Sequence, residues 1–162
     1  MSEELESELV EFKVTLDSIW HNEPPKYQVL LDGELIESGE VIEKSESGDE
    51  KIITFSKDLI EGDHTIQIRL VGKQNYHTPI DENGNIIADQ LLNIKQIEID
   101  EIELDYLYYN LGKYHKQINP IDAVSPLYEA EPLADSYKNL GWNGEWRLQF
   151  TVPTYMWFLE NL

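Results

Sequence analysis

The sequence predicts an all-β protein, an antiparallel β-sandwich with a long proline-rich loop and a short C-terminal helix. Apolar and polar residues alternate with a period of two in several separate segments, which is the pattern of half-buried strands. The dipeptide Asp32-Gly33 stands between two of these segments and is typical of a tight hairpin turn. Short strands at such a spacing favour a sandwich or a barrel.

The amino-acid composition limits which kinds of protein this chain can be and which partners it can bind. The 162 residues suit one domain, and 41% hydrophobic with 27% charged residues is ordinary for a globular chain. A formal charge of −20 repels phosphate, so neither nucleic acid nor an anionic membrane is expected as a partner. We expect no signal peptide, because the acidic start MSEELESE lacks basic and apolar runs, and no membrane-spanning segment, because no apolar run approaches ~18 residues. The absence of cysteine excludes disulfides and thiolate chemistry.

We divide the chain into an acidic tail (residues 1–9), a sandwich core (10–105) and a C-terminal extension (106–162) that completes the sandwich. Alternation is clear at 10–16, 27–31, 66–70 and 145–150, and it changes phase near Asp100-Glu101, which predicts a tight turn or a bulge there. The predicted core residues are Phe12, Val14, Leu16, Val29, Leu31, Ile66, Ile68, Ile97, Ile99, Leu148 and Phe150.

The extension contains a loop punctuated by prolines from Pro120 to Pro132, a strand at 145–152 and a helix at 154–162. This helix is too short to be stable alone, so its apolar residues must be buried against the sheet or a partner. Helical spacing places Tyr155, Phe158, Leu159 and Leu162 on one face and leaves Trp157 for a rim or a neighbouring subunit. Tyr155, Trp157 and Phe158 are therefore the candidate interface residues. The alternative is that the whole segment caps the domain's own core.

The sequence does not favour an enzyme. It has no G-x-S-x-G, no glycine-rich phosphate loop and no H-E-x-x-H, and its histidines at 21, 64, 77 and 115 share no ligand spacing. Carboxylates are so numerous that no general acid and base pair stands out from the solvated background.

Residues 72–89 interrupt the strand pattern and hold the candidate binding groups. Asp81, Glu82 and Asn83 offer oxygen ligands that a hard cation such as calcium would need, although the glycine and glutamate positions of an EF-hand are missing. The favoured alternative is a hairpin turn at Asn83-Gly84. The rings of Trp20, Tyr76 and His77 could stack on a sugar, and the alternative for them is packing in the core or at its rim.

The first hundred residues resemble the calcium-dependent xylan-binding modules. The resemblance lies in Tyr27-Gln-Val-Leu-Leu-Asp32-Gly33, Ile53-Thr-Phe55, Gly62-Asp-His64-Thr-Ile-Gln-Ile and Asp89-Gln-Leu-Leu-Asn-Ile-Lys-Gln-Ile-Glu-Ile99. It implies a jelly-roll, carbohydrate-binding-module-like sandwich with an acidic calcium ligand at Asp89, so the candidate metal residues are Asp81, Glu82, Asn83 and Asp89. The chain departs from the family at Gly72-Lys-Gln-Asn75, where the family has a Thr-Asn-Asp ligand run. No cofactor other than calcium is expected.

The last third is similar to small proteins of tailed bacteriophages, notably the T4-like viruses of marine cyanobacteria. The similarity lies in Ile97-Glu-Ile-Asp-Glu-Ile-Glu-Leu104 and in Trp142-Asn-Gly-Glu-Trp146-Arg-Leu-Gln-Phe150-Thr-Val-Pro153-Thr-Tyr155-Met-Trp157-Phe-Leu-Glu-Asn-Leu162. This resemblance implies a structural or accessory protein of the virion, such as a decoration, fibre or collar component.

Together these observations predict a non-enzymatic virion protein that makes assembly contacts with other virion proteins or with copies of itself, as a homo-oligomer. It would reside in the virion or, during assembly, in the host cytoplasm. The first alternative is a calcium-assisted module that binds host surface polysaccharide, and the second is a glycan-active hydrolase.

Overall fold

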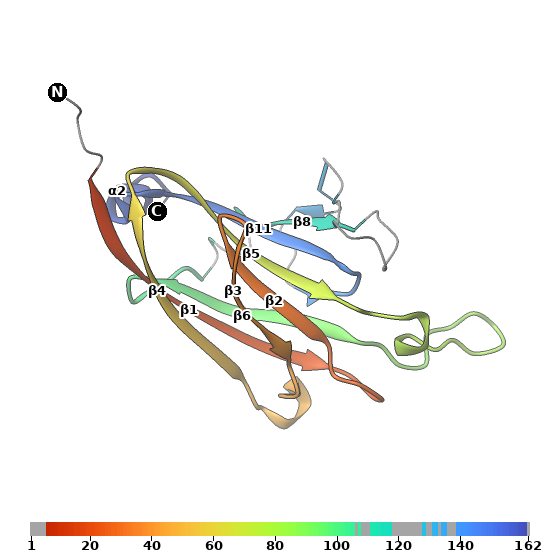
Figure 1. The fold of residues 1–162 in the computed structure, drawn as a ribbon. Helices are drawn as coiled ribbons and strands as arrows, with labels where there is room; N and C mark the ends of the chain where they lie inside the picture. Colours follow the sequence, from red (N-terminus) through yellow and green to blue (C-terminus); the bar gives the residue numbers. More distant parts are fainter. Residues whose placement is uncertain are drawn as a thin grey trace.

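Two antiparallel sheets pack face to face in the computed structural model, which describes residues 6–105, 107, 111–117, 128, 131–132, 134–135 and 139–161 (Figure 1). Sheet A has the order β10-β6-β1-β4, with β7 beside β6. Its strands are β1 (Ser7–Ile19), β4 (Lys51–Ile60), β6 (Leu91–Ile99), β7 (Ile102–Glu103) and β10 (Asn139–Leu140). Sheet B has the order β3-β2-β5-β11-β8-β9. Its strands are β2 (Lys26–Leu31), β3 (Glu34–Glu40), β5 (Gly62–Val71), β8 (Lys113–Lys116), β9 (Ala134–Asp135) and β11 (Gly144–Val152).

Within the described ranges, the other elements are short helices: η1 (Ser45–Ser47), η2 (Asn75–His77) and α2 (Thr154–Asn161). In the part of the chain that the structure describes, no helix has the length and apolar character needed to cross a membrane. The sandwich class predicted from the sequence is therefore confirmed, including the short C-terminal helix.

The inward faces of the two sheets form one hydrophobic core. All eleven predicted core residues are buried, and none exposes more than 3% of its surface. The large rings of Tyr27, Tyr114 and Trp146 are also fully buried. Strands of the predicted extension complete both sheets, because β10 pairs with β6 and β11 pairs with β5.

Two tight turns lie where the sequence predicts them. Asp32 and Gly33 have φ values of 50° and 80° between β2 and β3, the positive values that a type I′ hairpin requires. Asp100 and Glu101 have φ values of 53° and 67° between β6 and β7. The phase change in the hydrophobic pattern is thus a turn.

The element boundaries differ slightly from the sequence prediction. β1 begins at Ser7, so the end of the predicted acidic tail is strand, and β11 begins one residue early at Gly144. The predicted proline-rich loop lies mostly outside the described residues, as does Leu162 at the end of the predicted helix.

The predicted orientation of the C-terminal helix is wrong. Trp157 and Phe158 are 5% and 4% exposed, whereas Tyr155 and Leu159 are 63% and 73% exposed. The first turn sets this orientation, because the Thr154 amide donates to Glu8 Oε1 (2.9 Å) and its hydroxyl donates to Asp100 Oδ2 (2.6 Å). Trp157 then packs 6.3 Å from the Phe150 ring, so the helix closes one end of the core. Of the three candidate interface residues, Tyr155 alone is on the surface.

His64 ties two turns of the sandwich together. Its Nδ1 lies 2.6 Å from Asp32 Oδ2, and its Nε2 lies 2.7 Å from the Ile60 carbonyl oxygen. Both ring nitrogens face acceptors, an arrangement that the imidazolium form satisfies. Burial alone would lower the pKa of His64, but the hydrogen bonds to Asp32 and Ile60 outweigh burial and raise it.

We expect the His64 contacts to make stability depend on pH. A raised folded-state pKa means that their contribution is complete below the unfolded value, about 6.5, and is lost as the pH rises through the folded value. As the pH rises above about 6.5, the melting temperature of the protein should therefore fall more steeply than that of His64→Gln. Parallel pH profiles for the two proteins would contradict the assignment of a charged His64.

A second expectation concerns neighbouring residues on opposite faces of β11. Leu148 is fully buried, whereas Gln149 is exposed. Leu148→Ala should lower the free energy of unfolding by about 2–5 kcal/mol through lost burial and a cavity. Gln149→Ala should change it by less than about 0.5 kcal/mol. Chemical denaturation of both variants checks the register, and similar losses in the two would refute it.

Candidate functional site

Loops gather at the end of the sandwich opposite α2, and we call residues 20–25, 72–90 and 141–143 the loop end. The connection from β5 to β6 extends well beyond the strands there, at the right of Figure 1. Trp20, Tyr76, His77 and the four candidate metal residues all belong to these loops. The predicted metal residues and ring residues therefore all lie at one end of the fold.

Glu23 joins two of these loops. Its Oε1 accepts a hydrogen bond from the Tyr76 hydroxyl (3.1 Å), and its Oε2 lies 3.4 Å from His77 Nε2. The Gln90 side chain donates to the Glu23 carbonyl oxygen (3.0 Å), and Asn22 Nδ2 donates to the Tyr76 carbonyl oxygen (3.2 Å). Residues 20–25 and 72–90 thus form one connected surface.

Tyr76 is fixed in place although 54% of its surface is exposed. Its ring lies 4.2 Å from the ring of His77, which is buried and accepts a hydrogen bond from the Gln74 amide at Nδ1 (2.8 Å). Desolvation and the Glu23 carboxylate raise the pKa of Tyr76, so its hydroxyl remains a donor at neutral pH. The structure therefore brings Tyr76 and His77 together, and the buried His77 ring supports the exposed Tyr76 ring.

Trp20 makes contacts of a different kind. Its Nε1 donates to the Ile42 carbonyl oxygen (3.3 Å), and the ammonium of Lys44 lies 4.2 Å from its ring centroid. A cation over the face of an aromatic ring is a favourable contact. These contacts match packing at the rim of the sandwich, the alternative that the sequence left open for Trp20.

The carboxylate of Asp89 is paired with the ammonium group of Lys73. Lys73 Nζ donates to Asp89 Oδ1 (2.9 Å) and to the carbonyl oxygens of Gln90 (2.9 Å) and Gly141 (2.7 Å). Thr78 Oγ1 also donates to Asp89 (2.6 Å). Burial would raise the pKa of Asp89, but the bonds from Lys73 and Thr78 outweigh burial and lower it. The oxygen atoms that would attract calcium already surround a lysine.

Asp81, Glu82 and Asn83 form a hairpin turn. Ile80 pairs with Ile86, the Gly84 amide donates to the Asp81 carbonyl oxygen (3.1 Å), and Gly84 has a φ of 81°. The hairpin is thus confirmed, but its central residues are Glu82 and Asn83 and not the predicted Asn83-Gly84 pair. Asp81 Oδ1 accepts the amides of Asn83 (2.8 Å) and Asn85 (2.9 Å), and these bonds, that from Asn85 foremost, lower the pKa of Asp81.

No group of three or more Asp, Glu or His side chains gathers as a metal site among the described residues. The structure gives Asp81 and Asp89 separate partners, the Asn83 amide and the Lys73 ammonium. Calcium binding stays a prediction, and the Lys73 ammonium is the group with which calcium would compete.

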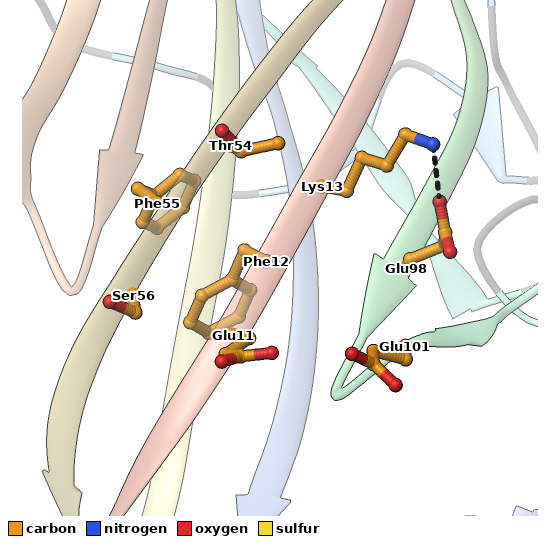
Figure 2. A pocket seen from close by; sticks show the side chains of 8 residues that line it. All are labelled: Glu11, Phe12, Lys13, Thr54, Phe55, Ser56, Glu98 and Glu101. Atoms are coloured by element: carbon orange, nitrogen blue, oxygen red, sulfur yellow. Dashed lines mark ion pairs between the residues drawn. The ribbon is translucent and has the colours of Figure 1, made fainter.

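Two hollows that the sequence did not reveal lie along sheet A. One, of about 360 Å³, is lined by Glu11, Phe12, Lys13, Thr54, Phe55, Ser56, Glu98 and Glu101 (Figure 2). Figure 2 shows the Lys13 ammonium reaching across to Glu98, at 3.3 Å. The other, of about 250 Å³, is lined by Asp17, Ile19, Ser45, Leu91, Asn93, Ile94, Lys95 and Asn139. Outward residues of β1 line these hollows together with buried core residues such as Phe12 and Ile94.

The outer face of sheet B holds a buried carboxylate. Glu145 is 1% exposed and accepts hydrogen bonds from Arg69 Nε (2.8 Å), Gln67 Nε2 (3.0 Å) and Arg147 Nε. Burial would raise the pKa of Glu145, but these donors lower it. The guanidinium carbons of Arg69 and Arg147 lie 5.2 Å and 5.9 Å from the Tyr128 ring, so this network holds Tyr128 against the sheet.

The pKa values of three carboxyl groups are shifted in the direction that does not suit acid catalysis. Asp81, Asp89 and Glu145 are all shifted downward, whereas a general acid at neutral pH needs a raised pKa. Hydrogen bonds inside the protein stabilise each of these charges. None of these three carboxyl groups therefore suits the role of a general acid at neutral pH.

Comparison with models of protein families gave no match, and neither did comparison with curated protein sequences. Among solved structures, the chain is similar to one described as vCBM60 in complex with galactobiose. The match has 8% sequence identity and a TM-score of 0.45, and it covers 87% of this chain and 97% of the other. Similarity at this level carries no inference about ligands.

The Lys73 contacts lead to a prediction about calcium. Lys73→Met removes the ammonium while keeping an apolar side chain, and it leaves Asp89 and two carbonyl oxygens without their cation. Millimolar calcium should raise the melting temperature of this variant more than that of the unaltered protein, because binding to the folded state alone stabilises it. Equal responses of the two proteins, measured by scanning calorimetry with and without chelator, would show that calcium and Lys73 do not compete.

Proposed function

We propose that this chain is a non-enzymatic β-sandwich that binds polysaccharide through its loop end. The observation that carries the proposal is Tyr76, whose ring is half exposed and yet held by Glu23 and His77, while Asn22 holds its backbone carbonyl. A fixed ring loses little conformational entropy on binding, and this preorganisation favours affinity. An exposed aromatic side chain without a binding role would be expected to move freely in solvent. That expectation does not account for these contacts.

The chemistry around Tyr76 suits a sugar. An aromatic face packs against the apolar C–H face of a pyranose, while carboxylate and amide groups at its edge bond to hydroxyl groups. Glu23 supplies a carboxylate beside the ring, and Asn22 supplies an amide that is bonded to the Tyr76 backbone carbonyl. The charge of −20 repels uronate and sulfate groups, so the proposed ligand is an uncharged polysaccharide.

Affinity electrophoresis through gels that contain neutral polysaccharides tests the proposal. At least one of these polysaccharides should retard the unaltered protein. Tyr76→Ala should raise the dissociation constant about tenfold, which corresponds to a loss of about 1.4 kcal/mol in binding free energy. Tyr155→Ala is the matched control, because Tyr155 is similarly exposed but lies on α2 at the opposite end. Tyr76→Phe separates the ring from its hydrogen bond to Glu23 and should keep most of the affinity.

Two results would overturn the proposal. Equal retardation of Tyr76→Ala and the unaltered protein would remove the loop end from the binding site. Release of reducing sugar from the retained polysaccharide would replace the binding function with a hydrolytic one.

Assembly contacts in a phage particle are a second candidate function, and the exposed apolar surface of α2 favours them. Such a role is compatible with glycan binding, because the two surfaces lie at opposite ends of the sandwich (Figure 1). Labelling of purified particles by antibodies to the protein tests it. Labelling confined to the cytoplasm of infected cells would exclude a virion component.

A further inference from the structure

The outward face of α2 carries three exposed apolar side chains, Tyr155, Met156 and Leu159, which we call the helix patch. They are 63%, 48% and 73% exposed. The opposite face is anchored, since Trp157 and Phe158 are buried and Thr154 is bonded to Glu8 and Asp100. The helix patch is therefore a fixed apolar surface.

Acidic segments of the chain meet at the α2 end. The segments 6–12, 59–66, 99–105 and 148–161 contain neither lysine nor arginine. Contacts bring these segments to one end of the sandwich: Thr154 to Glu8 and to Asp100, the Glu61 amide to the Glu6 carbonyl oxygen, and Val152 opposite Gly62. Their acidic residues are Glu6, Glu8, Glu11, Glu61, Asp63, Asp100, Glu101, Glu103, Asp105 and Glu160.

We propose that the helix patch docks a basic amphipathic segment of another protein. The apolar side of such a segment would cover Tyr155, Met156 and Leu159, while its lysines or arginines would meet the carboxylates of the α2 end. Charge complementarity of this kind steers association and disfavours partners of like charge. A second copy of this chain is therefore disfavoured as the occupant, because it would bring another −20 charge to an already acidic surface.

A fluorescent synthetic helix of leucine and lysine, about 18 residues long, serves as the probe. The companion peptide has the same composition in an order that gives no apolar face. Anisotropy titrations compare both peptides on the full chain and on two double variants. Met156→Ser with Leu159→Ser alters the helix patch, and Ile86→Ser with Ile87→Ser is the matched control, because these isoleucines are equally exposed on the hairpin of the loop end.

The amphipathic peptide should bind the full chain more tightly than its companion, and binding should weaken as salt rises from about 50 to 500 mM. The helix-patch variant should lose at least about tenfold in affinity, since two large apolar side chains leave the contact, and the control variant should not. Equal binding of the two peptides, or equal losses in both variants, would overturn the proposal by reducing the effect to general attraction of cations.

Sedimentation velocity supplies the remaining outcome. Self-association that the helix-patch variant abolishes would overturn the proposal in favour of a second copy as the occupant, and a monomer at all concentrations supports it. Neither result depends on whether the loop end binds polysaccharide, so the two proposals fail separately.

Discussion

Burial of the inward face of β1 is the constraint on which the rest of the structure depends. β1 pairs with β4 and β6 on its two sides, and Val10, Val14 and Leu16 are completely buried. Phe12 stacks on Phe55 in sheet A and meets the edge of Phe150 in sheet B. A slip of one residue would turn this whole row to solvent, so the register is fixed. The polar row of β1 must then face outward. Surfaces that could contact a ligand or partner therefore lie on that outer face and at the two ends of the sandwich.

The two ends differ in how their charges are satisfied. At the loop end, Lys73 meets Asp89 and two carbonyl oxygens, and Glu23 meets Tyr76 and His77. At the α2 end, Glu8 and Asp100 accept hydrogen bonds from Thr154, which is uncharged. Lys73 thus offsets the charge of Asp89 at the loop end, whereas an uncharged residue bonds to Glu8 and Asp100 at the α2 end. The first surface suits a neutral ligand with hydroxyl groups, and the second suits a cationic partner.

Local patterns in the sequence were enough to predict the sandwich and its core. Alternation placed Ile66 and Ile68 inside, and Asp32-Gly33 marked a turn, because both signals arise from neighbouring residues. The face of α2 could not be predicted in this way, since Glu8, 146 residues before Thr154, helps to set it. The pairing of Lys73 with Asp89 and the burial of Glu145 likewise depend on contacts between loops or strands. In so acidic a chain, these carboxylates resembled solvated surface.

The central claim is that a fixed surface around Tyr76 at the loop end makes the ligand contact. Amide chemical-shift mapping during titration with a neutral oligosaccharide, taken from a polysaccharide that retards the protein, tests it most directly. We predict that the largest shifts fall on Asn22, Glu23, Tyr76 and His77, while the amides of Thr154–Asn161 stay unchanged. Shifts concentrated on the outer face of sheet A, around Lys13 and Glu98, or on α2 would contradict the claim.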